Sequence, residues 1–204
     1  MKKIIIDETG YLIDKVPPAL YEELLQSLKI NEIEAKTRVN DSCLAGNIEK
    51  EFDVTNIIPY NFYEYLALLA NDYYLKFTLK DNRGRKTFKF LKSWLNCQKK
   101  YEFNPLHTHS GNLSWVLWIK IPYDVEEELK LSNCINSNDP KNSLFSFYTH
   151  SLLESHDIRV SSDMESNIIM FDSKLMHQVY PFYTSDEYRI SMAGNITTTW
   201  LTEK

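Results

Sequence analysis

The chain has 204 residues and a formal charge of −5 at pH 7, with 23 Lys and Arg residues against 28 Asp and Glu residues. This length is enough for one domain with its own hydrophobic core. The negative charge argues against nonspecific nucleic-acid binding through a basic face. No run approaches the ~20 apolar residues of a membrane span, and the three cysteines form no Cys-x-x-Cys pair. We therefore expect a protein of the reducing cytoplasm, without a membrane or nucleic-acid partner.

The first 82 residues predict short strands and then helices. Short apolar segments on either side of a Thr-Gly turn in residues 4–14 indicate two strands. Residues 17–30 begin with two prolines and carry leucines at helical spacing, which predicts a helix. Residues 31–56 are polar and mixed, and we interpret them as mostly loop. A second, longer helix is predicted in residues 59–79, with one apolar stripe formed by Phe62, Tyr65, Leu66 and Leu69.

From about residue 83 the pattern changes to strands. About seven or eight short strands are expected between turn signals, and strand-like segments are residues 86–103, 113–121, 143–149, 158–162, 167–172 and 187–200. Helices followed by short strands are typical of a mainly β fold, either a β-sandwich or a jelly roll that carries N-terminal helices. We expect a single domain, residues 1–204. Its N-terminal strand and helical region spans about 1–82, and its jelly-roll core spans about 83–204.

Two of the five histidines stand one residue apart. On an extended segment His107 and His109 point to the same side, so their rings can aim at one metal ion. A third ligand has to come from elsewhere, and His177 follows the strand predicted at 167–172 by one short turn. A His-x-His pair alone is more often structural than metal-binding. We treat His150 and His156 as ordinary polar residues.

Arg189 and Ser191 share one face of the last predicted strand. If that face is interior, the arginine needs an anionic partner, and no acid lies on its face nearby. A guanidinium pairs bidentately with a carboxylate, and a serine hydroxyl adds a hydrogen bond. Three histidines, an arginine and a serine in one cavity would imply a metal and a small carboxylate. The alternative is a surface arginine paired with Asp186 or Glu187.

Three segments, 93–122, 168–182 and 188–195, together carry a family resemblance. They hold a His-x-His motif before a strand, a histidine after a Phe-x-Ser turn, and an Arg-x-Ser motif twelve residues later. In this combination the chain resembles the Fe(II)/2-oxoglutarate-dependent oxygenases, and more narrowly an oxygenase group common in tailed phages. The similarity extends from about Ser93 to Ile196, about half of the chain.

The resemblance implies a double-stranded β-helix, a jelly-roll variant, with specific roles for five residues. The metal ligands would be His107, His109 and His177, and Arg189 with Ser191 would bind the remote carboxylate of 2-oxoglutarate. The cofactor would be Fe(II), and 2-oxoglutarate the cosubstrate.

One departure from the family pattern concerns His109. Most of the superfamily has Asp or Glu at this position, which gives two histidines and one carboxylate as ligands. With three imidazoles the metal keeps its full +2 charge, and zinc also becomes a candidate. Alternatively, His109 is not a ligand and a carboxylate such as Glu102 or Asp172 reaches the metal instead.

Five further residues are expected near the site. Asn96, Gln98 and Ser114 lie in apolar strands and need polar partners, so they either orient the histidines or face solvent. Trp94 and Trp118 are expected to fill the core, or else to wall the pocket.

By resemblance, the chain is a dioxygenase that couples 2-oxoglutarate decarboxylation to oxidation of a substrate, as in a hydroxylase. A zinc hydrolase or lyase would explain three histidines but leaves Arg189 and Ser191 without a role. A non-catalytic jelly-roll protein, in a virion for example, is the third alternative. Residues 123–143 are expected to form a loop near the pocket mouth. The substrate and homo-oligomerisation stay open, and a phage-encoded chain would act in the host cytoplasm.

Overall fold

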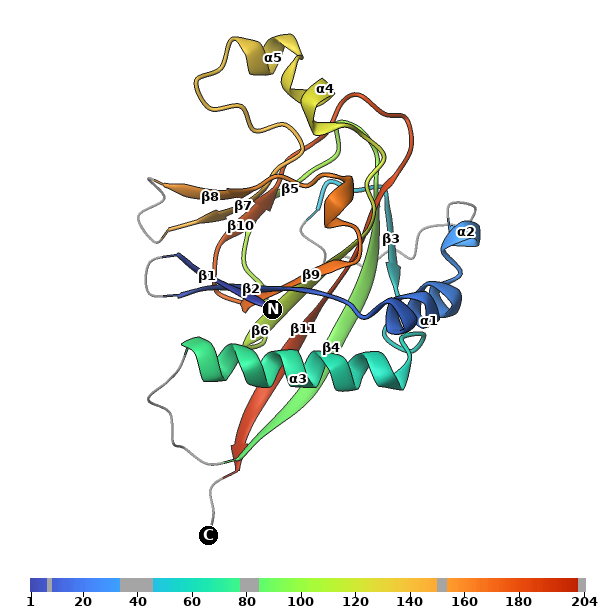
Figure 1. Cartoon of the computed structure of the whole chain (residues 1–204), viewed down its shortest axis with the longest axis vertical. Coiled ribbons are helices and arrows are strands. Elements are labelled where there is room, and N and C mark those ends of the chain that lie inside the picture. The colour runs from blue at the N-terminus through green and yellow to red at the C-terminus, as the bar shows by residue number, and fades with distance from the viewer. Residues whose placement is uncertain (7–8, 34–45, 78–84, 150–153, 202–204) are drawn as a thin grey trace.

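The computed structural model describes most of the chain as two antiparallel sheets with helices packed on one of them (Figure 1). The described residues are 1–6, 9–33, 46–77, 85–149 and 154–201. His150 therefore lies outside the described residues.

The larger sheet has seven strands and the smaller sheet four within the described residues. In order across the larger sheet they are β1 (Lys2–Ile6), β2 (Thr9–Lys15), β9 (Asn167–Asp172), β6 (Leu113–Lys120), β11 (Arg189–Leu201), β4 (Arg85–Gln98) and β3 (Lys50–Asp53). In the smaller sheet they are β5 (Asn104–His107), β10 (His177–Val179), β7 (Phe145–Tyr148) and β8 (Ser155–Ile158). The prediction of a mainly β protein is confirmed, and the N-terminal strands extend the same sheet as the later ones.

Both predicted N-terminal helices are present and cover one face of the larger sheet. They are α1 (Pro18–Leu28), with proline in its first turn, and α3 (Tyr60–Phe77). Figure 1 shows α3 lying across β4 and β11. Their buried side chains form one core with the sheet residues beneath them; the helical members are Leu24, Leu28, Phe62, Leu66, Leu69, Ala70 and Tyr73. The apolar stripe of the second helix is thus core, as its spacing predicted.

A second core joins the two sheets. Successive residues of β9 alternate between the cores, because Ile168 and Met170 face the helices while Ile169 and Phe171 face the smaller sheet. The ring of Phe171 lies 4.9 Å from the ring of Phe147 on β7. Aromatic contacts of this kind hold the smaller sheet against the larger one, and the cavity described below opens between them.

The same alternation gives β4 two different faces. Leu95 and Cys97 lie in the helix-side core, whereas Trp94, Asn96 and Gln98 line the cavity. The alternating sequence of this strand predicts one shared face for Phe88, Phe90, Lys92, Trp94, Asn96 and Gln98. The prediction is correct from Lys92 onwards and wrong for Phe88 and Phe90, which pack against the helix-side core, because the pairing of β4 with β11 has an irregularity before Lys92. The alternation makes one strand both a packing element and a wall of the site.

Three segments differ from the sequence prediction. Residues 50–53, interpreted as loop, form β3, because the short polar segment pairs with the edge of β4. The strand expected at 158–162 is β8 (Ser155–Ile158), whose polar residues give no apolar alternation, and a short 3-10 helix, η1 (Ser162–Met164), follows it.

The segment 123–143, expected to be a loop near the pocket mouth, is partly helical. It contains the short helices α4 (Val125–Leu129) and α5 (Ser132–Ile135), and Asp124 caps α4 by accepting a hydrogen bond from the amide of Glu126. None of these residues lines the cavity. A further short helix, α2 (Ile30–Ile33), follows α1.

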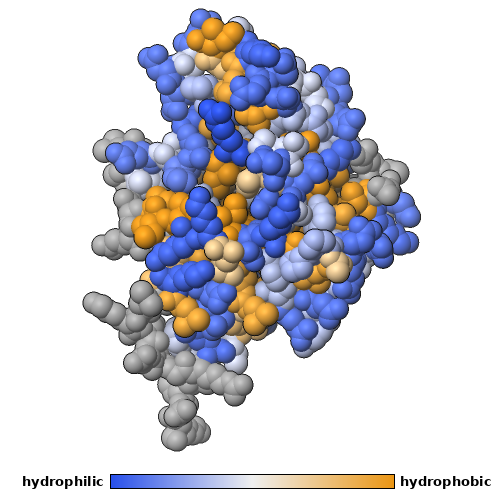
Figure 2. Space-filling model, viewed as in Figure 1, coloured by the Kyte–Doolittle hydropathy of each residue, from blue (hydrophilic) through white to orange (hydrophobic). Residues whose placement is uncertain are grey.

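On the face shown in Figure 2, hydrophobic residues form separate areas with hydrophilic residues between them. Among the described residues, no helix has both the length and the apolar character needed to cross a bilayer.

Candidate metal centre and cavity

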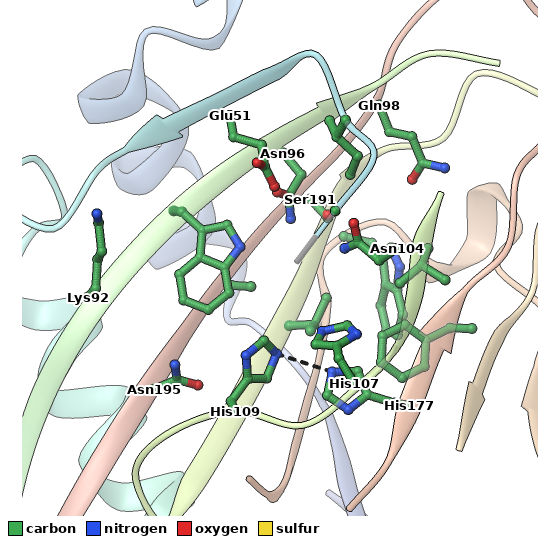
Figure 3. Close-up of a pocket in the computed structure, with 18 of the residues that line it drawn as sticks. Glu51, Lys92, Asn96, Gln98, Asn104, His107, His109, His177, Ser191 and Asn195 are labelled. Carbon is green, nitrogen blue, oxygen red and sulfur yellow. Dashed lines mark hydrogen bonds between the residues drawn. The ribbon is translucent and has the colours of Figure 1, made fainter. Parts of the chain in front are cut away.

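Three histidines meet at one end of the smaller sheet (Figure 3). His107 ends β5 and His177 begins β10, and the antiparallel pairing of these strands sets the two residues directly opposite each other. The Nε2 atom of His109 lies 3.1 Å from Nε2 of His177. One ring nitrogen from each histidine lies within 4.8 Å of the other two. The structure thus brings together the three histidines that the sequence predicted to converge.

Backbone carbonyls fix the tautomers of two of these rings. Nδ1 of His107 lies 2.6 Å from the carbonyl oxygen of Pro105, and Nδ1 of His177 lies 2.9 Å from that of Leu175. A carbonyl only accepts hydrogen bonds, so each Nδ1 carries the proton. Each Nε2 is left with its lone pair directed into the cluster, which is the arrangement that a metal ligand needs.

All three rings are held in the neutral form. Burial lowers the pKa of His107, and burial, with smaller effects of the nearby His107 ring and the Lys174 ammonium group, lowers the pKa of His109 to about 3. Burial lowers the pKa of His177 well below its ordinary value, and the other two histidines add to the effect. Metal binding requires unprotonated imidazole, so protons compete little for these nitrogens near neutral pH.

No carboxylate belongs to this cluster within the described part of the chain. The Glu102 carboxylate accepts hydrogen bonds from the amides of Glu49 and Lys99, and Oδ1 of Asp172 accepts one from the amide of Lys174. Neither of the two carboxylates considered as substitutes for His109 therefore lies in the cluster.

The donor set fits one metal ion. Two nitrogens at about 2.1 Å from an ion, and at a right angle to each other, would be about 3.0 Å apart, close to the 3.1 Å between His109 and His177. Imidazole nitrogen suits iron, zinc, nickel and copper alike. The residues therefore fit an iron site without excluding zinc.

A small hydrogen-bond network fixes the backbone next to the histidine cluster. The amide of His109 donates to the carbonyl of Ser173, and Nζ of Lys174 donates to the carbonyl of His109. The hydroxyl of Ser114 donates to Oδ1 of Asn195 and lies 3.0 Å from the hydroxyl of Ser173. Ser114 thus finds its polar partners inside the fold, and the turn before His177 holds the backbone of His109.

Arg189 is buried, with 2% of its surface exposed, and lines the same cavity. Its five N–H groups are all taken: Nε and Nη2 donate to Oε1 of Gln98, Nη1 to the Tyr123 hydroxyl and the Ser143 carbonyl, and Nη2 also to the Tyr180 carbonyl. Every one of these acceptors is neutral. Burial raises the pKa of Tyr123, although the neighbouring Arg189 opposes the shift, so the tyrosine hydroxyl stays protonated.

The alternative of a surface arginine is wrong. Asp186 forms an ion pair with Lys100 and Glu187 forms one with Lys120, both at the surface. Arg189 instead points into the protein, where its Cζ atom lies 5.8 Å from the centre of the Tyr123 ring and 5.5 Å from that of the Phe182 ring.

Gln98 is the acceptor of Arg189 that faces the cavity. It lines the cavity, whereas Tyr123, Ser143 and Tyr180 do not. Its single oxygen accepts from the Nε and Nη2 edge, which is the edge that carboxylates use in bidentate pairs. The sequence pointed to Gln98 as a residue needing a partner. It did not indicate Tyr123, because that contact depends on how distant segments pack.

The cavity has a volume of about 370 Å³ and is lined from both sheets. Trp94 and Trp118 line it and are also largely buried, so both are pocket wall as well as core. Ser191 is in register with Asn96 on one side and Trp118 on the other, which places all three on the cavity face of the sheet. A volume of this size suits a small molecule or a side chain.

Solved structures share this fold at low sequence identity. A prolyl-4-hydroxylase from Pseudomonas putida superposes with a TM-score of 0.54 at 12% identity, covering 96% of this chain and 94% of that one. HygX from Streptomyces hygroscopicus, with nickel and 2-oxoglutarate bound, gives 0.55 at 13% identity, covering 97% and 86%. The viral collagen prolyl hydroxylase of Paramecium Bursaria Chlorella virus-1 gives 0.54 at 10% identity, covering 91% and 94%. These likenesses show the fold.

The sequence itself identifies the family. No curated protein sequence matches the chain. A family model described as "Putative 2OG-Fe(II) oxygenase" matches residues 92–195, which contain the three histidines, Arg189 and Ser191. The chain therefore belongs to the 2OG-Fe(II) oxygenases, oxidoreductases that use Fe(II) and 2-oxoglutarate.

Proposed function

We propose that this oxygenase is a dioxygenase that hydroxylates a substrate still to be identified. His107, His109 and His177 hold the iron, and Arg189 with Ser191 binds the remote carboxylate of 2-oxoglutarate. The observation that carries the proposal is the meeting of three neutral imidazoles, two of them paired in strand register, in the cavity that also contains a buried arginine.

The strand order supports a jelly-roll core, the double-stranded β-helix. From β4 onwards the chain alternates between the sheets: β4 is in the larger, β5 in the smaller, β6 in the larger, β7 and β8 in the smaller, β9 in the larger, β10 in the smaller and β11 in the larger. This alternation wraps the chain around the cavity. It places the end of β5, which carries His107, beside the start of β10, which carries His177.

When bound, Fe(II) supplies the redox chemistry that couples decarboxylation of 2-oxoglutarate to oxidation of the substrate. The protein contributes position and charge. The carbonyls of Pro105 and Leu175 keep the Nε2 atoms of His107 and His177 unprotonated. Trp94 and Trp118 give the cavity part of an apolar wall.

The charge of the site favours a dianionic cosubstrate. Three neutral imidazoles leave the +2 charge of an ion uncompensated, and Arg189 adds a further positive charge whose hydrogen bonds all go to neutral acceptors. A molecule with a carboxylate at each end would compensate both positive charges, that of the ion and that of Arg189. Its remote carboxylate would replace the Gln98 oxygen as the hydrogen-bond acceptor on the edge of Arg189 that faces the cavity.

The proposal is tested by anaerobic titration of the purified protein with Fe(II) and then with 2-oxoglutarate. We expect one equivalent of iron and a weak visible charge-transfer band that develops only when both are present. Aerobic assays with fractions of cell extract should then raise succinate formation above its level without extract. Tightly bound zinc without a spectral change on addition of 2-oxoglutarate would indicate a zinc enzyme. Binding of neither metal nor 2-oxoglutarate would indicate a non-catalytic binding protein.

A further inference from the structure

Arg189 has three hydrogen-bond acceptors outside the cavity. They are the Tyr123 hydroxyl and the Ser143 carbonyl, both on Nη1, and the Tyr180 carbonyl on Nη2. None of the three residues lines the cavity, and we call them the outer acceptors. When a carboxylate replaces Gln98 on the Nε and Nη2 edge, the hydrogen bonds to the outer acceptors remain. They then set the plane of the guanidinium, and a bidentate pair depends on that plane.

Glu128 is a buried carboxylate close to these outer acceptors. It lies on α4, and none of its surface is exposed. Its Oε1 atom accepts three hydrogen bonds, from the amides of Tyr183 and Thr184 at 2.8 and 2.7 Å and from the Thr184 hydroxyl at 2.7 Å. Burying a charge is costly unless hydrogen bonds compensate it, and bonds to a carboxylate are among the strong ones. The carboxylate therefore holds residues 183 and 184 against α4.

The residues that Glu128 holds belong to the connection from β10 to Arg189. Figure 1 shows α4 beside this connection. The connection includes Tyr180, whose carbonyl accepts from the arginine at 2.8 Å. It also includes Phe182, whose ring lies 5.5 Å from Cζ of the arginine and stacks on the ring of Tyr123 at 4.8 Å. Glu128 thus fixes the chain that supplies two neighbours of the guanidinium.

Glu128 is linked to the other two outer acceptors as well. Its carbonyl oxygen accepts a hydrogen bond at 3.3 Å from Nδ2 of Asn142, the residue before Ser143. Tyr123 directly precedes the residue that caps α4. The three segments that carry the outer acceptors therefore meet at Glu128, although they are far apart in the sequence.

We propose that Glu128 is a positioning residue for 2-oxoglutarate, which holds the outer acceptors so that Arg189 keeps its orientation when the cosubstrate replaces Gln98. This inference rests on the proposed function, since it assigns the support of the same arginine. Glu128 does not line the cavity and acts through the backbone of its neighbours. Its loss should therefore lower the affinity for 2-oxoglutarate and leave the bound metal in place.

The test is an anaerobic titration of the iron-loaded full chain with 2-oxoglutarate. Glu128→Ala removes the acceptor, and the Kd should rise about tenfold. Glu128→Gln keeps an oxygen acceptor but loses the charge that strengthens its hydrogen bonds, and its Kd should rise about threefold. Glu127→Ala, which removes an exposed carboxylate of the same helix paired with Lys130, is the matched control and should bind as the native chain does. A native Kd in Glu128→Ala, or tighter binding by Glu128→Gln than by the native chain, would overturn the inference.

An Arg189→Lys background separates positioning from a general loss of structure. Substitutions that act through one another are not additive. Glu128→Ala should therefore change the Kd by less than about threefold once Arg189 is already lysine. The full effect in both backgrounds, or a loss of metal, would show that Glu128 supports the fold as a whole. Should Glu128→Ala fail to fold, Glu128→Gln is compared in the two backgrounds and should change the Kd only when the arginine is present.

The Nε–H signal of Arg189 keeps this inference distinct from the proposed function. This group is buried and donates to Gln98 at 3.1 Å, so its proton should exchange slowly enough for NMR of the zinc-loaded chain without 2-oxoglutarate. The signal should shift or disappear in Glu128→Ala and stay unchanged in Glu127→Ala. An unchanged signal in Glu128→Ala would overturn the inference. If the native chain fails to bind 2-oxoglutarate, the proposed function fails, and the signal still decides whether Glu128 positions Arg189.

Discussion

Replacing Gln98 with glutamate should weaken the binding of 2-oxoglutarate, because the new carboxylate would occupy the edge of Arg189 that the cosubstrate needs. In the native chain Oε1 of Gln98 accepts from Nε at 3.1 Å and from Nη2 at 2.7 Å of Arg189. Gln98→Glu places a charged carboxylate at the same position with almost no change in size. The remote carboxylate of 2-oxoglutarate then has to displace an ion pair where it otherwise displaces a neutral amide.

The size of the effect follows from burial. Gln98 and Arg189 are 3% and 2% exposed, so separating the new pair leaves a buried charge without its partner. Breaking a buried pair in this way costs roughly 3–5 kcal/mol. At about 1.4 kcal/mol per factor of ten, 2-oxoglutarate should bind roughly two to three and a half orders of magnitude more weakly.

The assay is an anaerobic titration of the iron-loaded protein with 2-oxoglutarate, and the charge-transfer band measures binding. Gln98→Met is the matched control, because it keeps the volume and removes the competing oxygen, and it should bind 2-oxoglutarate at least as tightly as the native chain. Metal content should be the same in all three proteins. Native affinity in Gln98→Glu would refute the reasoning, because the carboxylate would then bind without using this edge of Arg189.

Three further predictions concern the metal, the arginine and the core. His177→Ala should lose the bound metal, since it removes the most buried of the three rings; a full equivalent of iron by metal analysis would remove His177 from the site. Arg189→Lys keeps the charge but not the planar fork, so the Kd for 2-oxoglutarate should rise at least tenfold with metal content unchanged, and a loss of metal would indicate a structural role. Phe62→Ala should lower the free energy of unfolding by about 3–5 kcal/mol, because this fully buried ring packs against Trp115 between α3 and the larger sheet. A denaturant midpoint close to the native one would contradict that packing.

The sequence predicted those features that depend on local periodicity. One residue between His107 and His109 was enough to place both rings on one side, and the helical spacing of Phe62, Leu66 and Leu69 was enough to bury them. The alternation in β4 placed Trp94 and Asn96 on one face correctly, but it failed for Phe88 and Phe90, which lie on the helix side beyond an irregularity in the strand pairing.

What the sequence did not reveal depends on contacts between distant segments. The strand β3 exists because four residues of mixed polarity pair with the edge of β4, and nothing in their own pattern requires it. The neutral surroundings of Arg189 come from Gln98, Tyr123 and the carbonyls of Ser143 and Tyr180, on segments far apart in the chain. The sequence pointed to an anion for this arginine, and it gave no sign of four neutral acceptors from distant segments.

The most direct measurement is an anaerobic crystal structure of the complex with Fe(II) and 2-oxoglutarate. We predict iron bound by Nε2 of His107, His109 and His177, and the remote carboxylate on Arg189 with the side chain of Gln98 displaced. Iron held by a carboxylate side chain in place of His109, or 2-oxoglutarate bound while Gln98 still contacts Arg189, would contradict the proposed site.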